Sequence, residues 1–110
     1  MAVSEDYVDY VRELLAWVTG LGSKRMFGGV GMSSEGVSFA VLIDDTLYLK
    51  ADDRNRPMFE AGGAEIFSYQ RQGKTQTMSY WSVPGDVLED PDLLRQWAET
   101  ALDAAFRAKR

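Results

Sequence analysis

The spacing of hydrophobic residues changes twice along this chain, and that change constrains the fold more than any other feature. Residues 4–18 and the stretch from residue 90 onward carry apolar side chains at three- and four-residue intervals, the spacing of amphipathic helices. The stretch between them is rich in β-branched and aromatic residues and is broken by glycines and short polar turns. With 110 residues and 45% hydrophobic content, the chain suits a single domain over 1–110 with one core.

Capping residues mark both end helices. Ser4 is a suitable N-cap for the first helix, which is expected to reach Val18 and to stop at the glycines that follow. Asp90 is a suitable cap for the last helix, with Pro91 at its first helical position.

The central stretch predicts strands and one short helix. A turn at Asp44 and Asp45 joins two of the strands, and Pro57 favours a helix start near Arg56 rather than at Asp53. Strands are expected at 24–27, 37–43, 46–50, 66–70 and 75–81, with the helix ending at residue 61 and a turn at 84–85. The predicted class is therefore α+β, in the order α-β-β-β-α-β-β-α, with helices packed on an antiparallel sheet.

The chain contains no histidine and no cysteine. Histidine is the commonest general base and metal ligand, and cysteine supplies thiol catalysis, zinc sites and disulfides. A serine nucleophile would then need a lysine partner, but no Ser-x-x-Lys spacing occurs. The acid pairs at 44–45 and 52–53 suit turn and cap chemistry better than a calcium loop. We therefore expect no catalytic residues, no cofactor and no metal.

The formal net charge of −5 is concentrated in the two ends of the chain, since residues 20–80 hold seven basic and seven acidic side chains. Direct nucleic-acid binding, which draws on clustered Lys and Arg, is therefore not expected. A local basic patch is the alternative, from Lys24, Arg25, Arg54, Arg56, Arg71 and Lys74. The acidic first residues are not a signal peptide, and no apolar run approaches the roughly 20 residues of a membrane span. A cytoplasmic protein is expected.

The glycines at 28, 29 and 31 invite comparison with phosphate-binding loops. Such loops lead from a strand into a helix, whereas here another strand follows. We therefore expect a bend that needs positive φ or a close backbone approach. The alternative is a small anionic ligand, or a weak enzymatic activity on one, held by the glycine backbone with Arg25 and Lys50.

Two further patterns leave alternatives open. Tyr80 and Trp81 are neighbours on a strand, so one of them must face away from the core, toward a helix or a partner. The last helix carries alanines on two sides, at 98, 101, 104, 105 and 108. These favour either a homodimer through this helix or close packing and helix propensity within the chain.

Five segments together resemble one family. They are Arg25-Met26-Phe27-Gly28-Gly29-Val30-Gly31, Phe39-Ala40, Leu47-Tyr48-Leu49-Lys50, Phe67-Ser68-Tyr69 and Tyr80-Trp81-Ser82-Val83-Pro84. In this order they resemble the amino-terminal domain of TfoX-like (Sxy-like) competence regulators, over nearly the whole chain. Met32 departs from the pattern, which has an aromatic residue there.

The resemblance implies a fold similar to that of type III secretion chaperones and a link to natural competence, where full-length members act with a transcription activator. Those members carry a second, helical domain, so this chain is expected to be a stand-alone first domain. We expect a non-catalytic regulatory or protein-interaction domain whose protein partner is unidentified, with a homodimer as one option and direct DNA binding least favoured. The candidate interaction surface consists of Arg25, Met26, Phe27, Gly28, Gly29, Gly31, Tyr48 and Lys50.

Overall fold

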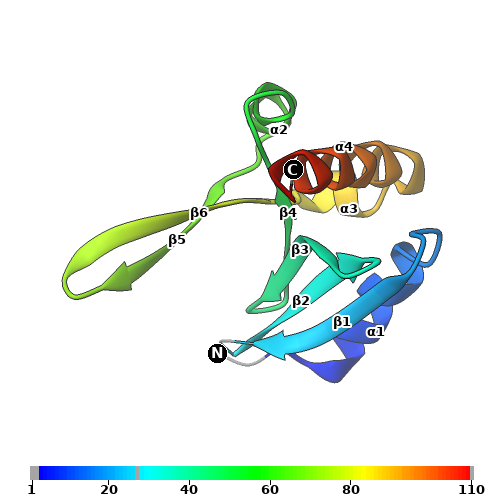
Figure 1. Ribbon diagram of the computed structural model, residues 1–110, viewed down its shortest axis with the longest axis horizontal. Coiled ribbons are helices and arrows are strands. Elements are labelled where there is room, and N and C mark those ends of the chain that lie inside the picture. The colour runs from blue at the N-terminus through cyan, green and yellow to red at the C-terminus, as the bar shows by residue number, and fades with distance from the viewer. Residues whose placement is uncertain (1–2, 27, 110) are drawn as a thin grey trace.

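The computed structural model describes residues 3–26 and 28–109 (Figure 1). The elements follow the order α1 (Glu5–Leu14), β1 (Leu21–Met26), β2 (Gly29–Ser34), β3 (Val37–Ile43), β4 (Thr46–Lys50), α2 (Arg56–Ala61), β5 (Ile66–Arg71), β6 (Lys74–Ser82), α3 (Gly85–Leu88) and α4 (Pro91–Lys109). The described strands form one antiparallel sheet in the order β1-β2-β3-β4-β6-β5. The predicted α+β class with an antiparallel sheet is confirmed, and the structure adds a strand and a short helix.

The added strand is β2, which begins inside the glycine-rich stretch where a bend was expected. Met26 pairs with Gly29, and Gly28, directly before β2, adopts a φ of +77°. A Cβ at Gly29 would lie 2.4 Å from the Leu42 carbonyl oxygen. The expected close backbone approach is therefore found, but within a regular strand pair.

The first helix is shorter than its hydrophobic spacing predicts. Ser4 caps α1 as expected, because its Oγ accepts a hydrogen bond from the Tyr7 amide at 3.2 Å. The helix ends at Leu14, and the Val18 amide bonds the Leu15 carbonyl in a tighter turn. Leu15 and Val18 nevertheless reach the core, which explains why the apolar spacing continues beyond the helix.

The starts of α2 and α4 agree with the sequence, whereas α3 was not expected. α2 begins at Arg56, so the later of the two predicted starts is confirmed. The Asp90 carboxylate accepts a hydrogen bond from the Leu93 amide at 3.2 Å, which confirms that cap. The expected turn at residues 84–85 leads instead into α3. No helix within the described residues has both the length and the apolar character needed to span a membrane.

One face of the sheet packs against the helices. Cross-strand register places Leu42 beside Leu47 and Ala40 beside Leu49 on this face. α1, α3 and α4 supply the other half of the core with Val11, Val87, Leu94 and Trp97, together with Leu15 directly after α1. Ala98, Ala101, Ala104 and Ala105 are also buried within the chain, whereas Ala108 is exposed.

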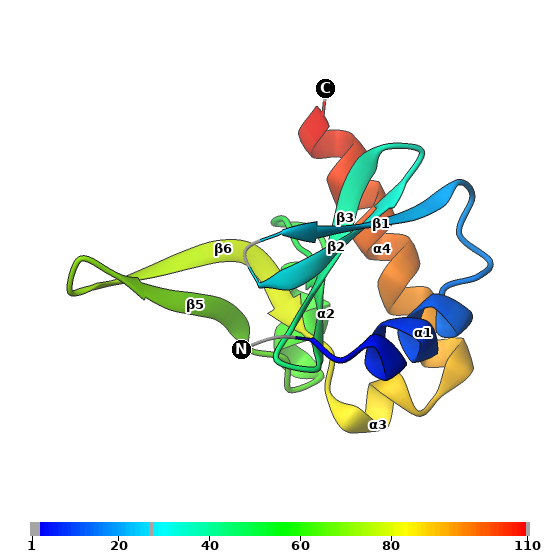
Figure 2. The ribbon, with the colours of Figure 1, turned by 90° about the horizontal axis from the view of Figure 1, so that it is seen from below.

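The hairpin of β5 and β6 projects well beyond the rest of the sheet (Figures 1 and 2). Only the end of β6 continues into the sheet, where Tyr80, Trp81 and Ser82 pair with β4. We call residues 66–79 the arm. All of its residues are exposed except Phe67, which is half-buried.

Candidate functional site

The sheet face opposite the helix-covered core carries four of the eight expected interaction residues, Gly29, Gly31, Tyr48 and Lys50. Gly31 pairs with Val41, which pairs with Tyr48, and Lys50 pairs with Tyr80. Paired residues share a face, so these side chains lie opposite Leu42, Leu47 and Leu49. We call this the open face, defined by Gly29, Gly31, Val41, Ile43, Tyr48, Lys50 and Tyr80. Val41 and Tyr80 are buried there but do not belong to the core cluster of the described residues.

Arg25 lies on the other side of the sheet. It pairs with Val30, whose partner Leu42 belongs to the core face, and its guanidinium lies 3.8 Å from the Glu5 carboxylate of α1. Three strand spacings, roughly 14 Å, also separate β1 from β4. The structure therefore does not bring Arg25 together with Lys50 around an anion, as the alternative interpretation required.

The turn residues of the expected surface are placed only in part. Met26 is the last residue of β1, and only its backbone is described. Phe27 lies outside the described residues. Gly28 is exposed in the turn, whereas Gly29 and Gly31 are buried in β2. Gly29 and Gly31 therefore contribute only backbone to the open face.

An apolar groove of about 470 Å³ lies between the open face and the arm. Val41 and Ile43 of β3 and the β2 backbone at Gly29 form one side. Phe67, Tyr69, Arg71 and Met78 of the arm form the other side, and Val30 completes the lining. Among the described residues that line the groove, Arg71 is the only charged one.

The arm is amphipathic. Its inner side carries an aromatic row, since the Phe67 ring lies 5.1 Å from Tyr48 and 5.9 Å from Tyr69 between centroids. Tyr69 and Met78 are each 38% exposed. The outer side is polar, with Ser68 opposite Thr77 and Gln70 opposite Thr75 in the strand register. Such a ribbon places apolar side chains in water unless something covers its inner side.

Charge differs between the two ends of the arm. Near its root, burial and the negative charges of Asp44 and Glu65 raise the pKa of the Tyr48 hydroxyl. At its tip, Arg71 pairs in register with Lys74, and residues 66–85 contain no acid. The other basic residues of the alternative patch lie on β1 and around the start of α2.

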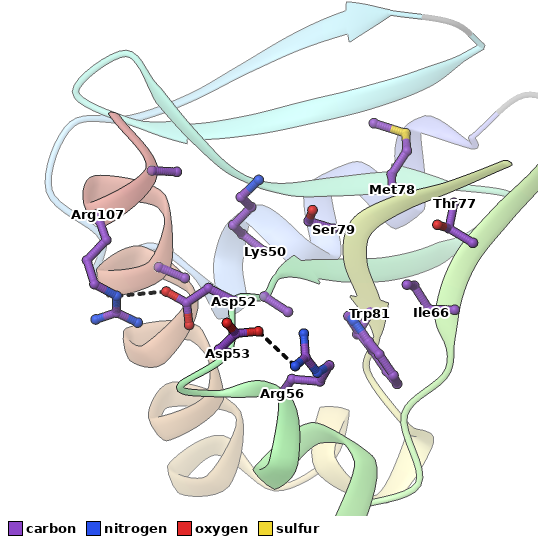
Figure 3. A pocket seen from close by; sticks show the side chains of 13 residues that line it. Lys50, Asp52, Asp53, Arg56, Ile66, Thr77, Met78, Ser79, Trp81 and Arg107 are labelled. Carbon is purple, nitrogen blue, oxygen red and sulfur yellow. Dashed lines mark hydrogen bonds and ion pairs between the residues drawn. The ribbon is translucent and has the colours of Figure 1, made fainter. Parts of the chain in front are cut away.

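Lys50 borders a second, polar hollow of about 540 Å³ (Figure 3). Both arginines of this hollow are paired, Arg107 with Asp52 and Arg56 with Asp53, each at 2.7 Å. The hydrogen bond from Arg107, aided by the amides of residues 54 and 55, lowers the pKa of Asp52 to about 2. The Lys50 ammonium lies 5.3 Å from the Tyr80 ring centroid.

The hydrogen bonds beside this hollow join β4, the loop before α2, and α4. Asn55 is buried, donates to the Lys50 carbonyl at 3.0 Å and accepts from the Asp52 amide at 2.8 Å. Asp52 links that loop to Arg107 of α4. These contacts hold the end of β4 in place. They give Asp52 and Arg107 a structural role within the chain.

Sequence reasoning missed the arm residues Phe67, Tyr69 and Met78 as parts of a site, and it considered Arg71 only for the alternative basic patch. Their alternation with polar residues was readable as a strand. The signal that could have identified these residues is the row of polar residues that alternates with them, which predicts an amphipathic ribbon. The polar residues are Ser68, Gln70, Thr75 and Thr77. The projection of this ribbon beyond the body depends on tertiary structure.

The fold and the open face define a small α+β domain with an uncovered apolar groove, and comparison with known proteins identifies its family. Residues 3–105 match the TfoX N-terminal domain, and the chain belongs to this family. The chain is also 30% identical over 102 residues to the DNA transformation protein TfoX1 of Aliivibrio fischeri. That match covers 92% of the chain and 46% of the relative, so the chain spans about half the length of the curated relative it matches.

Proposed function

We propose that this chain is a non-catalytic, cytoplasmic regulatory domain that acts in DNA transformation by binding protein through its open face and arm. The observation that carries this proposal is the apolar groove beneath an amphipathic arm. Exposed apolar surface of this kind, bordered by polar residues, is typical of protein-interaction sites. The process is suggested by membership in the TfoX N-terminal domain family and by the relative named a DNA transformation protein.

The anionic-ligand alternative has weaker support. It needs Arg25, Lys50 and the glycine backbone at one site, but Arg25 lies on the opposite face of the sheet. Direct DNA binding also draws little support, because the described basic residues are dispersed over several elements and the chain carries a net charge of −5.

A chimera tests the proposed function. This chain replaces the matching segment of TfoX1 in an Aliivibrio fischeri strain that lacks the native protein, and transformation frequency is measured. We expect the chimera to restore transformation. Tyr69→Asp with Met78→Asp, which places two charges in the groove, is expected to reduce the frequency about tenfold or more.

The matched control uses the outer side of the same arm. Gln70→Asp with Thr77→Asp adds the same charge to the same two strands but leaves the groove lining unchanged. It should preserve transformation. Equal transformation frequencies for the two double variants would exclude the groove as the binding site. Failure of the unaltered chimera to restore transformation at normal protein levels would contradict a role in DNA transformation.

A further inference from the structure

We propose that a second copy of this chain occupies the groove, and that the two chains exchange arms around a two-fold axis. Each arm would place its apolar inner side in the groove of the partner subunit. This inference rests on the proposed function, since it assigns a partner to the same docking surface.

The first argument concerns the stability of the arm. An isolated two-stranded ribbon is only marginally stable in water and normally needs a third strand or a covering layer. The Ser79 carbonyl still accepts a hydrogen bond from the Ala51 amide at 2.8 Å, and Phe67 packs on Tyr48. Further toward the tip, no third strand pairs with the arm within the described residues, and its exposed inner side carries Tyr69 and Met78. Covering that side would remove apolar area from water and hold the ribbon in one position.

The second argument is that the surface is suited to contact a copy of itself. A two-fold dimer brings the same patch of each chain together, so the patch must complement itself. Here the aromatic side of the arm, with Phe67 and Tyr69, lines the groove of its own chain. The same side of the arm would also enter the groove of the partner subunit. Aromatic rings packed in this way also gain from offset or edge contacts between the two arms.

The third argument is electrostatic. The arm tip carries Arg71 and Lys74, whereas its root lies beside Glu65 and the negative charge of Asp44. A two-fold axis through the groove runs the two arms in opposite directions, so the tip of each arm reaches the root of the other. Arg71 would then face Glu65 of the partner subunit, and two such attractive contacts would fix the antiparallel arrangement.

The alanine-rich helix offers less to a second subunit. Ala98, Ala101, Ala104 and Ala105 already pack inside the chain, and only Ala108 remains exposed among the alanines considered for a dimer. The polar hollow at Lys50 has both of its arginines paired within the chain. The arm and groove are therefore the stronger candidate for self-association.

The test measures mass in solution by sedimentation equilibrium across the micromolar range. We expect the wild type to approach twice its chain mass of 12.3 kDa. Arg71→Glu and Glu65→Lys, each alone, should weaken the dimer about tenfold or more, because each makes both contacts repulsive. Circular dichroism establishes that both variants are folded.

Mixing the two charge variants gives the sharpest result. In a heterodimer of the Arg71→Glu chain with the Glu65→Lys chain, both cross-arm contacts are again between opposite charges. We expect the mixture to recover dimer mass where neither variant alone does. A wild type that stays at single-chain mass overturns the proposal, as does a dimer indifferent to both variants or a mixture that fails to recover.

These outcomes separate the inference from the proposed function. A monomeric wild type whose groove variants still lose transformation contradicts arm exchange and leaves a different protein as the occupant. A dimer that follows the charge-swap pattern, with no effect of groove variants on transformation, supports arm exchange and contradicts the proposed function.

Discussion

Gly29 occupies a strand position that has no room for a methyl group. A Cβ there would lie 2.4 Å from the Leu42 carbonyl oxygen and 3.0 Å from the Ile43 side chain. The first of these neighbours is backbone held in the β2–β3 pairing, so it cannot move away without disturbing the sheet. We expect Gly29→Ala to lower the free energy of unfolding by about 1–3 kcal/mol, measured by urea denaturation.

Gly85 is the matched control for this substitution. It starts α3, and nothing lies within 4 Å of a Cβ built on it. Gly85→Ala is therefore expected to change stability by about 0.5 kcal/mol or less. A Gly29→Ala protein as stable as the Gly85→Ala protein would show that β2 tolerates the methyl group.

Asp52 makes stability depend on pH in the acid range. Its pKa is lowered from an ordinary value of 3.8 to about 2 in the folded chain, mainly by the hydrogen bond from Arg107. A lowered folded pKa contributes stability that is present above about pH 4 and is lost as pH falls toward 2. We expect Asp52→Asn to cost about 1–2 kcal/mol at neutral pH, with the difference from wild type shrinking below pH 4.

Asp53 provides the comparison, because it forms an equally short ion pair with Arg56 but its side chain is 91% exposed. Asp53→Asn should change stability little at any pH, since solvent screens such pairs. Urea titrations at a series of pH values measure both variants. If wild type and Asp52→Asn differ in free energy of unfolding by the same amount from neutral pH to below pH 4, Asp52 does not have a lowered pKa in the folded chain.

At the scale of elements, α2 depends on one aromatic stack. It is a short helix without a side-chain cap, and Phe59 packs on Trp97 of α4 with ring centroids 4.6 Å apart. Both residues are buried. We expect Phe59→Ala to lower the free energy of unfolding by about 3–5 kcal/mol. Met58→Ala, which truncates a half-buried side chain of the same helix, should cost less, and thermal unfolding followed by circular dichroism compares the two.

The arm is the element whose order should depend on association. In a single chain its strands pair only with each other through most of their length, so its amides should open easily. If arms exchange, hydrogen exchange at residues 66–79 slows as protein concentration rises, whereas exchange in β3 does not change. The Arg71→Glu variant should lose this dependence. Exchange in the arm that is the same at all concentrations would contradict its burial.

At the scale of the whole molecule, the separation of charge between arm and body predicts a response to salt. The chain has a net charge of −5, yet the only charged residues in 66–85 are the basic residues Arg71 and Lys74. Attractive contacts between arm tip and partner root are screened as ionic strength rises, while apolar contacts are not. We expect the dimer to weaken moderately at high salt without dissociating fully, measured by sedimentation equilibrium. A dimer that tightens with salt would point to an interface without these ion pairs.

Local patterns determined much of this protein without tertiary information. The caps Ser4 and Asp90, the turn at 44–45 and the late start of α2 were predictable because each depends on residues a few positions apart. The family signature was readable for the same reason. β2 was missed, because glycines at 28–31 favour a bend locally and only pairing with β1 and β3 makes them a strand.

Tertiary structure alone decided which residues meet. Sequence spacing grouped Arg25 with Lys50 and the glycines, but strand register places Arg25 on the helix-covered face and Tyr48 and Lys50 on the open one. A shift of one residue in register reverses every side chain, and that choice is made by burial against α1 and α4 rather than by the strand itself. The chain therefore encodes most of its elements locally, while β2, the groove and the projecting arm arise only from packing across the whole sheet.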